Sequence, residues 1–199
     1  HHWQKESPHR ATHLKQMEFQ GVRDETVRNL HYLGREYADK KEWQKSLKTY
    51  ERYFNMNTGD FPGQMAQAYL VQAECYRNLD RAGDAVASCL SAVPLDYTRR
   101  DAFFFIGQLY ESMNNYPAAL IWFSAANAIP FNPQGYMNDM RLYTWGTHDK
   151  LSVCYQRLGM IDIARMHWLE ALKYLPDGPE GARILANGRW MYLKEVPKT

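Results

Sequence analysis

The chain has 199 residues, with 24 Lys and Arg against 22 Asp and Glu, so its formal net charge is +2. This near balance gives no electrostatic argument for binding to nucleic acid or to an anionic membrane. Hydrophobic residues make up 45% of the chain and aromatic residues 14%, which is typical of a globular rather than a disordered protein. No apolar run approaches the roughly 20 residues that a membrane-spanning helix needs.

Residues 1–26 predict a linker and one capping helix. Ser7 and Pro8 have the residue types of a helix N-cap and first helical position, so we expect a helix over 8–19 that covers the repeats which follow. The chain begins with His1 rather than Met. We therefore expect either a piece of a longer polypeptide or a residual tag at His1 and His2.

A recurring spacing organises residues 27–176. Each unit has a tyrosine, a small residue nine positions later, and a bulky or soft apolar residue thirteen positions later. The four tyrosines are Tyr37, Tyr76, Tyr110 and Tyr155. Fixed internal offsets indicate one supersecondary unit that is used repeatedly. The spacing predicts pairs of antiparallel helices over 27–60, 64–97, 100–131 and 145–176.

Small residues set how closely the helices of a pair can approach. In the third pair we expect helices over 101–113 and 116–128, with Gly107 and Ala119 at their crossing. The tyrosine-to-tyrosine spacings are 39, 34 and 45 residues, which places extra residues around 55–63 and 131–144. These loops are tolerated insertions or functional segments, and we favour the first interpretation.

The last 23 residues, 177–199, predict a second capping helix and a tail. Pro179 marks the start of this helix, and its apolar side chains are expected to cover the last pair. The final four residues are expected to be frayed.

These positions resemble the tetratricopeptide (TPR) repeat, and the third unit, through Gly107, Tyr110, Ala119, Phe123 and Pro130, matches best. The resemblance implies an all-α fold: a right-handed α-solenoid of about four TPR-like helical hairpins with N- and C-terminal capping helices. It also implies a concave groove, lined by the first helix of each pair, that binds a protein or peptide. The groove residues in this register are Arg28, His31, Arg35, Gln67, Glu74, Arg77, Phe104, Gln108 and Glu111.

Charge in this register predicts a polar gradient along the groove. Arg28 and Arg35 form a basic end, and Asp101, Glu111 and Asp149 form an acidic end. Such a groove suits an extended or helical peptide. The alternative is that these residues are ordinary solvated faces of amphipathic helices.

Three strings resemble, more specifically, the repeat region that follows the catalytic domain of some bacterial and phage family 2 glycosyltransferases. They are residues 28–37, RNLHYLGREY; residues 145–155, WGTHDKLSVCY; and residues 186–190, ANGRW. This resemblance implies a non-catalytic module, covalently linked to an upstream catalytic domain, that positions an acceptor or partner protein. The alternatives are a free-standing adaptor that binds a peptide in its groove and, with least support, a module that self-assembles through its loops.

The residues themselves predict no catalytic constellation, cofactor or metal site. No G-x-G-x-x-G, G-x-S-x-G, H-E-x-x-H or D-x-D pattern occurs. His9 and His13 share one face of the expected first helix but lack a third metal ligand. Cys75, Cys89 and Cys154 form an odd, sparse set, which favours packing roles in a reducing compartment and a cytoplasmic location.

Overall fold

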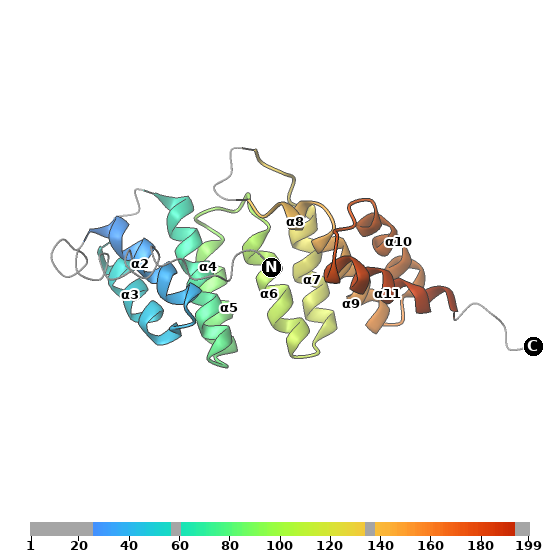
Figure 1. Cartoon of the computed structure of the whole chain (residues 1–199), viewed down its shortest axis with the longest axis horizontal. Helices are drawn as coiled ribbons and strands as arrows, with labels where there is room; N and C mark the ends of the chain where they lie inside the picture. The colour runs from blue at the N-terminus through green and yellow to red at the C-terminus, as the bar shows by residue number, and fades with distance from the viewer. Residues whose placement is uncertain (1–25, 57–60, 134–137, 194–199) are drawn as a thin grey trace, which may run out of the picture. The chain divides into compact units, whose positions relative to one another are not determined.

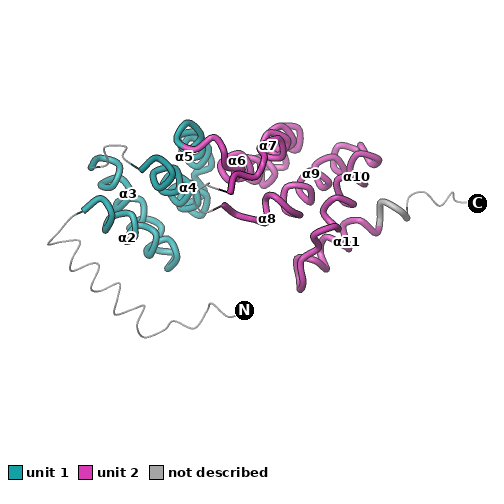
Figure 2. The backbone as a smooth tube through the Cα atoms, turned by 90° about the horizontal axis from the view of Figure 1, so that it is seen from above, with its two compact units in different colours: residues 1–95 teal, residues 96–199 magenta. Residues whose placement is uncertain are grey.

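The computed structural model describes residues 26–56, 61–133 and 138–193, and these residues form ten helices with no strand among them. The chain divides into two compact units, residues 1–95 and 96–199 (Figure 2). The helix expected over 8–19 lies outside the described residues, as do His1 and His2.

The first unit consists of two helical hairpins (Figure 1). Its helices are α2 (Val27–Asp39), α3 (Trp43–Met56), α4 (Pro62–Asn78) and α5 (Ala82–Ala92). Helix α4 packs against α3 and α2 as well as against its own partner α5. Leu30, Tyr50, Tyr53 and Ala68 form a fully buried cluster at this junction, so the two hairpins share one hydrophobic core.

The second unit also holds two hairpins, with two additional helices. Its helices are α6 (Asp101–Ser112), α7 (Tyr116–Ala128), α8 (Met140–Tyr143), α9 (Gly146–Arg157), α10 (Ile161–Leu172) and α11 (Pro179–Leu193). Helix α9 packs on α7, and α11 packs on α10. The Trp168 indole donates a 2.7 Å hydrogen bond to the Ile184 carbonyl, and a Cβ at Gly188 would lie 1.9 Å from its ring. The buried tryptophan is therefore one of the contacts that hold the closing helix, together with Ile184 in the same core cluster.

All four hairpins close with the same three-residue turn. The middle residue of each turn has a left-handed backbone conformation, with φ of 61° at Lys41, 58° at Asp80, 57° at Asn114 and 78° at Gly159. The next residue donates its N–H over 2.9 Å to the carbonyl of the recurring tyrosine. The donors are Glu42, Arg81, Asn115 and Met160, and the acceptors are Tyr37, Tyr76, Tyr110 and Tyr155. This helix-ending bond fixes the distance from each tyrosine to the next helix.

The left-handed conformation of Gly159 predicts how a substitution there changes the free energy of unfolding. Because a side chain in the left-handed region costs about 1 kcal/mol, Gly159→Ala is expected to lower the free energy of unfolding by about that amount. Gly83→Ala is the matched control: Gly83 lies inside α5 with no atom within 4 Å of its added Cβ, so the change is expected to stabilise by about 0.5–1 kcal/mol. Urea unfolding measures both, and shifts of the same sign would contradict the assignment.

Each hairpin crossing pairs a small residue with a larger one. A Cβ at Gly34 would lie 2.8 Å from the Tyr50 ring, and a Cβ at Gly107 would lie 2.6 Å from the Phe123 ring. In the second hairpin, Ala73 takes the place of the glycine and the buried Cys89 takes the place of the ring. The ring therefore occupies the space that the missing side chain leaves, which confirms the small residue expected at Gly107.

The second small position of the crossing is equally closed. Ala119 has no exposed surface and packs with Phe123, Leu151 and Cys154. We expect Ala119→Trp to abolish cooperative thermal unfolding, because an indole cannot fit at this crossing without displacing α9. Ser124→Trp, at an exposed position of the same helix, is the control and should unfold cooperatively. An unchanged melting curve for Ala119→Trp would refute the crossing.

Arg100 forms hydrogen bonds with the segment that precedes the last hairpin. Its guanidinium donates hydrogen bonds to the carbonyls of Ile129 at 2.8 Å, Leu142 at 2.7 Å and Asn127 at 3.1 Å. It also lies 4.5 Å from the centre of the Tyr143 ring. Because Arg100 donates to carbonyls at the end of α7 and in α8, the described part of this insertion is anchored to the start of α6.

Candidate functional site

Six of the nine predicted groove residues belong to the first unit. Arg28 is exposed on α2, and its guanidinium lies 5.8 Å from the centre of the Tyr32 ring. Glu74 and Arg77 form an ion pair one turn apart on α4, with two 2.6 Å contacts. Arg35 and Gln67 are half-buried. The surface that these residues offer is polar, and its strongest charges on α4 already neutralise each other.

His31 is a core residue, which corrects its assignment to the groove. Only 1% of its surface is exposed, and its ring centre lies 5.6 Å from that of Tyr53 and 6.2 Å from that of Tyr50. Burial, assisted by the positive charge of Arg35, lowers the pKa of His31 from 6.5 to about 4. The imidazole is therefore neutral at pH 7 and packs as an aromatic ring.

The lowered pKa of His31 makes stability depend on pH. Between pH 6.5 and about 4 the unfolded chain binds a proton at His31 that the folded chain does not, so stability is complete above pH 6.5 and falls as the pH decreases to about 4. The gap between the two pKa values corresponds to roughly 3 kcal/mol. We expect His31→Gln to flatten this part of the profile in urea unfolding at pH 4–7. A variant profile as steep as that of the original chain would contradict the buried, neutral assignment.

The remaining three groove residues lie in the second unit. Phe104 is half-buried with its ring centre 5.2 Å from that of Phe123, so it contributes to the core as well as to the surface. Gln108 is half-buried on the same helix. The Glu111 carboxylate accepts hydrogen bonds from Lys150 Nζ at 2.8 and 3.1 Å. Each unit therefore carries its own part of the predicted set.

The acidic residues of the expected gradient are each paired with a cation. Asp101 lies 2.8 Å from a nitrogen of Arg99, and Asp149, which is 2% exposed, lies 2.8 Å from a nitrogen of Arg183. With Glu111 held by Lys150, none of the three is a bare carboxylate. A basic ligand would have to displace a cation already in place, so the gradient read from the sequence overstates the negative charge available.

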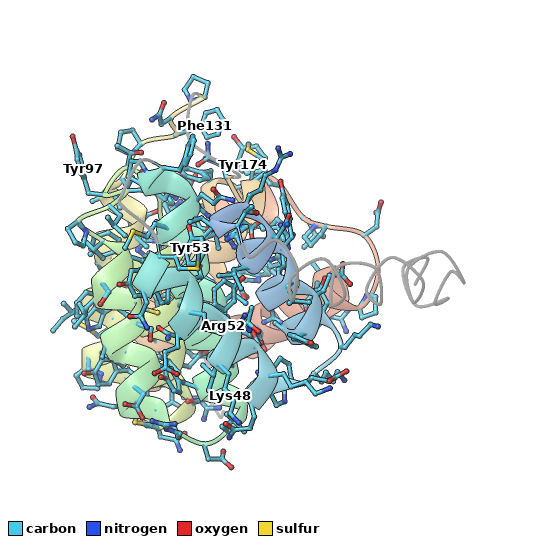
Figure 3. All side chains as sticks on the ribbon, turned by 90° about the vertical axis from the view of Figure 1, so that its left-hand side faces the viewer. Lys48, Arg52, Tyr53, Tyr97, Phe131 and Tyr174 are labelled. Atoms are coloured by element: carbon cyan, nitrogen blue, oxygen red, sulfur yellow. The ribbon has the colours of Figure 1, made fainter. Side chains whose placement is uncertain are left out.

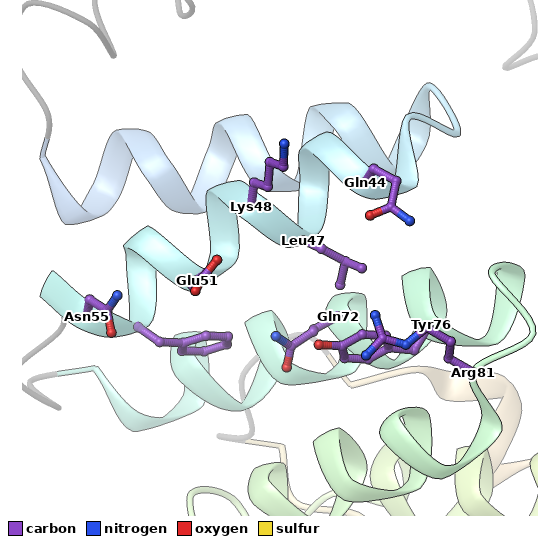
Figure 4. A pocket seen from close by; sticks show the side chains of 9 residues that line it. Gln44, Leu47, Lys48, Glu51, Asn55, Gln72, Tyr76 and Arg81 are labelled. Carbon is purple, nitrogen blue, oxygen red and sulfur yellow. The ribbon is translucent and has the colours of Figure 1, made fainter.

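A cleft lies between α3 and α4 in the first unit (Figure 4). Its volume is about 400 Å³. Leu47 and Phe54 of α3 and Tyr76 of α4 supply its apolar surface. Its polar lining residues are Gln44, Lys48, Glu51, Asn55, Gln72 and Arg81. Lys48 points outward from α3, whereas Tyr53 on the same helix has no exposed surface (Figure 3).

Contacts around the cleft hold its rings in place. The Phe54 ring stacks on Tyr69 with centres 4.1 Å apart. The Arg81 guanidinium lies 4.6 Å from the centre of the Tyr76 ring and also bonds Asp84 at 2.8 Å. Stacking and cation–π contacts of this kind order aromatic side chains before a ligand arrives. The cleft is thus lined mainly by amides and by charges of both signs, with aromatic rings that these contacts hold in place.

The lining of the cleft carries polar groups of several kinds. It contains amide, ammonium, carboxylate and guanidinium groups but no histidine, cysteine or hydroxyl nucleophile other than a tyrosine. The three cysteines are buried thiols, and burial raises the pKa of Cys89 and of Cys154 to about 12, so the thiolate is absent at pH 7. Among the described residues, no helix is both long and apolar enough to cross a membrane.

Sequence reasoning missed this cleft because it does not lie on the face chosen from the repeat register. The predicted residues come from the first helix of each pair, whereas most of the cleft comes from α3, the second helix of the first pair. One signal was available: the 39-residue spacing between the first two tyrosines showed that this junction carries extra residues.

Comparisons with known proteins identify the fold. No protein-family model and no curated protein matches the chain. Among solved structures, MamA is 18% identical, with 80% of this chain and 85% of MamA covered and a TM-score of 0.66. YrrB, described as "a TPR protein with an unusual peptide-binding site", is 14% identical, with coverage of 92% and 84% and a TM-score of 0.64.

A third solved structure extends the match over most of the chain. The C-terminal part of a TPR repeat-containing protein from Cytophaga hutchinsonii is 14% identical, with 96% of this chain and 69% of that chain covered and a TM-score of 0.73. The chain has the TPR fold. The all-α solenoid class predicted from the repeated tyrosine spacing is confirmed, and at these identities the likeness is one of fold alone.

Proposed function

We propose that this chain is a non-catalytic TPR scaffold that binds a segment of another protein. The observation that carries the proposal is the pre-formed cleft between α3 and α4, which offers apolar and polar groups without a catalytic set. The description of YrrB as having a peptide-binding site supports peptide recognition by this fold. The two lines of support are independent, since one is local geometry and the other is a structural likeness.

The proposed ligand is a peptide that places one apolar side chain on the rings of the cleft. Leu47, Phe54 and Tyr76 would contact that side chain, and its burial would add to the polar contacts that the rest of the lining makes. The amides of Gln44 and Asn55 can donate to and accept from an extended backbone. The opposite charges at the rim would select the neighbouring side chains.

Charge reversal on α3 tests this proposal. Peptides selected from a displayed random library on the full chain would be assayed by fluorescence anisotropy against Lys48→Glu and Glu51→Lys. Because the two reversals act oppositely on any charged peptide, we expect one to weaken binding about tenfold, equivalent to about 1.4 kcal/mol, and the other to leave it equal or tighter. Lys45→Glu, on the same helix but outside the cleft lining, is the control and should bind as the original chain does.

The groove predicted from the repeat register is the second candidate for the same function. Its support is the exposed Arg28 and the partly exposed Glu74–Arg77 pair. Binding that is lost in Arg28→Glu but retained in both α3 reversals would assign the peptide to this groove. If Lys48→Glu, Glu51→Lys and Arg28→Glu all bind the peptide as the Lys45→Glu control does, both sites are contradicted.

The link to a family 2 glycosyltransferase is a finer proposal that rests on the resemblance of residues 28–37, 145–155 and 186–190. None of the three solved structures above is described as a glycosyltransferase. In this proposal the scaffold positions an acceptor or partner protein beside a covalently attached catalytic domain. The sequence upstream of His1 tests it: a D-x-D pair on an α/β domain would support the link, and another kind of domain would contradict it.

The buried free thiols support a cytoplasmic location.

A further inference from the structure

Two histidines face each other across the last hairpin. His148 lies on α9 and His167 on α10, both half-buried, and their Nδ1 atoms are 3.0 Å apart. Their ring centres are 5.2 Å apart. The Tyr155 ring stacks on His167, with centres 5.5 Å apart and planes 6° apart, and so fixes the orientation of that imidazole. The pair is therefore held by both helices of one hairpin.

The fold does not require histidine at these places. His148 stands seven residues before the recurring tyrosine of its hairpin and His167 stands twelve residues after it. The same two positions hold Phe103 and Trp122 in the third hairpin, where the rings also touch, with centres 6.2 Å apart. Because an apolar ring pair fills the equivalent site in the third hairpin, packing alone does not require two histidines in the last hairpin.

Two ring nitrogens at this distance are joined either by a hydrogen bond, in which one neutral Nδ1–H donates to the other Nδ1, or by an ion that bridges two Nδ1 atoms without protons. A neutral imidazole has one N–H and one lone pair, and two Nδ1 lone pairs 3.0 Å apart repel. Either a proton or a metal ion relieves the repulsion. Burial lowers the pKa of both histidines, and for His148 the cations Arg100 and Lys173 add to this, against the raising effect of Glu170. Imidazole binds a metal through a ring nitrogen that carries no proton, so the Nδ1 atoms of both rings are available as ligands when their protons are on Nε2.

We propose that His148 and His167 together bind one divalent transition-metal ion through their Nδ1 atoms. With metal–nitrogen bonds of about 2.0–2.1 Å, a 3.0 Å separation corresponds to an angle of roughly 95° at the metal. This angle is closer to a tetragonal than to a tetrahedral arrangement, and imidazole with tetragonal geometry favours Cu²⁺. The described part of the chain has no group of three or more His, Cys, Asp or Glu arranged around an ion, so water completes the coordination.

Nearby charges set how tightly the ion binds. Glu170, one turn after His167, is the negative group that acts on both rings, and it is paired with Lys173 at 2.7 Å. Arg100, which directly precedes α6, and Lys173 are the positive groups that act on His148. Because two cations stand against one carboxylate at His148, the surrounding charge does not favour a bound cation. The two imidazoles must supply the affinity, and the site is an exchangeable one rather than a closed structural site.

The test uses Cu²⁺ and the full chain with the four histidines that precede the described residues replaced. The chain has seven histidines, and changing residues 1, 2, 9 and 13 to Gln leaves His31, His148 and His167. We expect calorimetry to show one Cu²⁺ per chain and electron paramagnetic resonance to show hyperfine coupling from two nitrogens. His148→Phe combined with His167→Trp copies the third hairpin and should keep the fold while weakening Cu²⁺ binding at least about tenfold.

His31→Gln in the same background is the control and should bind Cu²⁺ as the background chain does. No nitrogen coupling in the background chain, or unchanged binding by the Phe–Trp variant, would overturn the proposal and leave the pair joined by a proton alone. If the Phe–Trp variant loses its helical circular dichroism, the coupling in the background chain decides by itself. Peptide binding at the α3–α4 cleft is measured separately, so failure of one proposal does not affect the other.

Discussion

The structure depends on a steric constraint at each hairpin crossing, where a side chain on the second helix fills the space that a small residue on the first helix leaves. Tyr50 takes this space at Gly34, and Phe123 takes it at Gly107. A single added methyl group would displace either ring, and close-packed interiors tolerate such changes poorly. Trp168 extends the constraint beyond its hairpin, because its ring lies where a side chain of Gly188 on α11 would be.

Packing of this kind leaves the outer faces of the helices free for recognition. The rings at the crossings, such as Tyr50 and Phe123, are buried, whereas rings such as Tyr97 and Tyr174 are exposed. Charges on these faces are held in pairs such as Glu74–Arg77 and Lys150–Glu111. Exposed ion pairs contribute little to stability, so a ligand that exchanges one of them for its own charge meets little resistance. A scaffold of this type can therefore change its partner preference through surface residues without disturbing the crossings that hold it together.

The fold was predictable because its determinants are local. The offset from each tyrosine to the next helix reflects a hydrogen bond between residues five apart, and the crossing residues repeat at fixed spacings. The surface was less predictable because its determinants are not local. His31 turns into the core through contacts with Tyr50 and Tyr53 of another helix. Asp149 meets Arg183 from 34 residues away, and no repeat register encodes that partner.

The same reasoning explains why the two candidate sites escape a reading of the repeats. A repeat register averages over equivalent positions, whereas a binding site is made where one unit differs from the others. The α3–α4 cleft depends on Phe54 stacking with Tyr69 across a junction lengthened by extra residues. The histidine pair occupies positions that hold Phe103 and Trp122 in the preceding hairpin. In a repeat protein, then, departures from the pattern at structurally equivalent positions are the more direct guide to function, since the pattern itself is explained by packing.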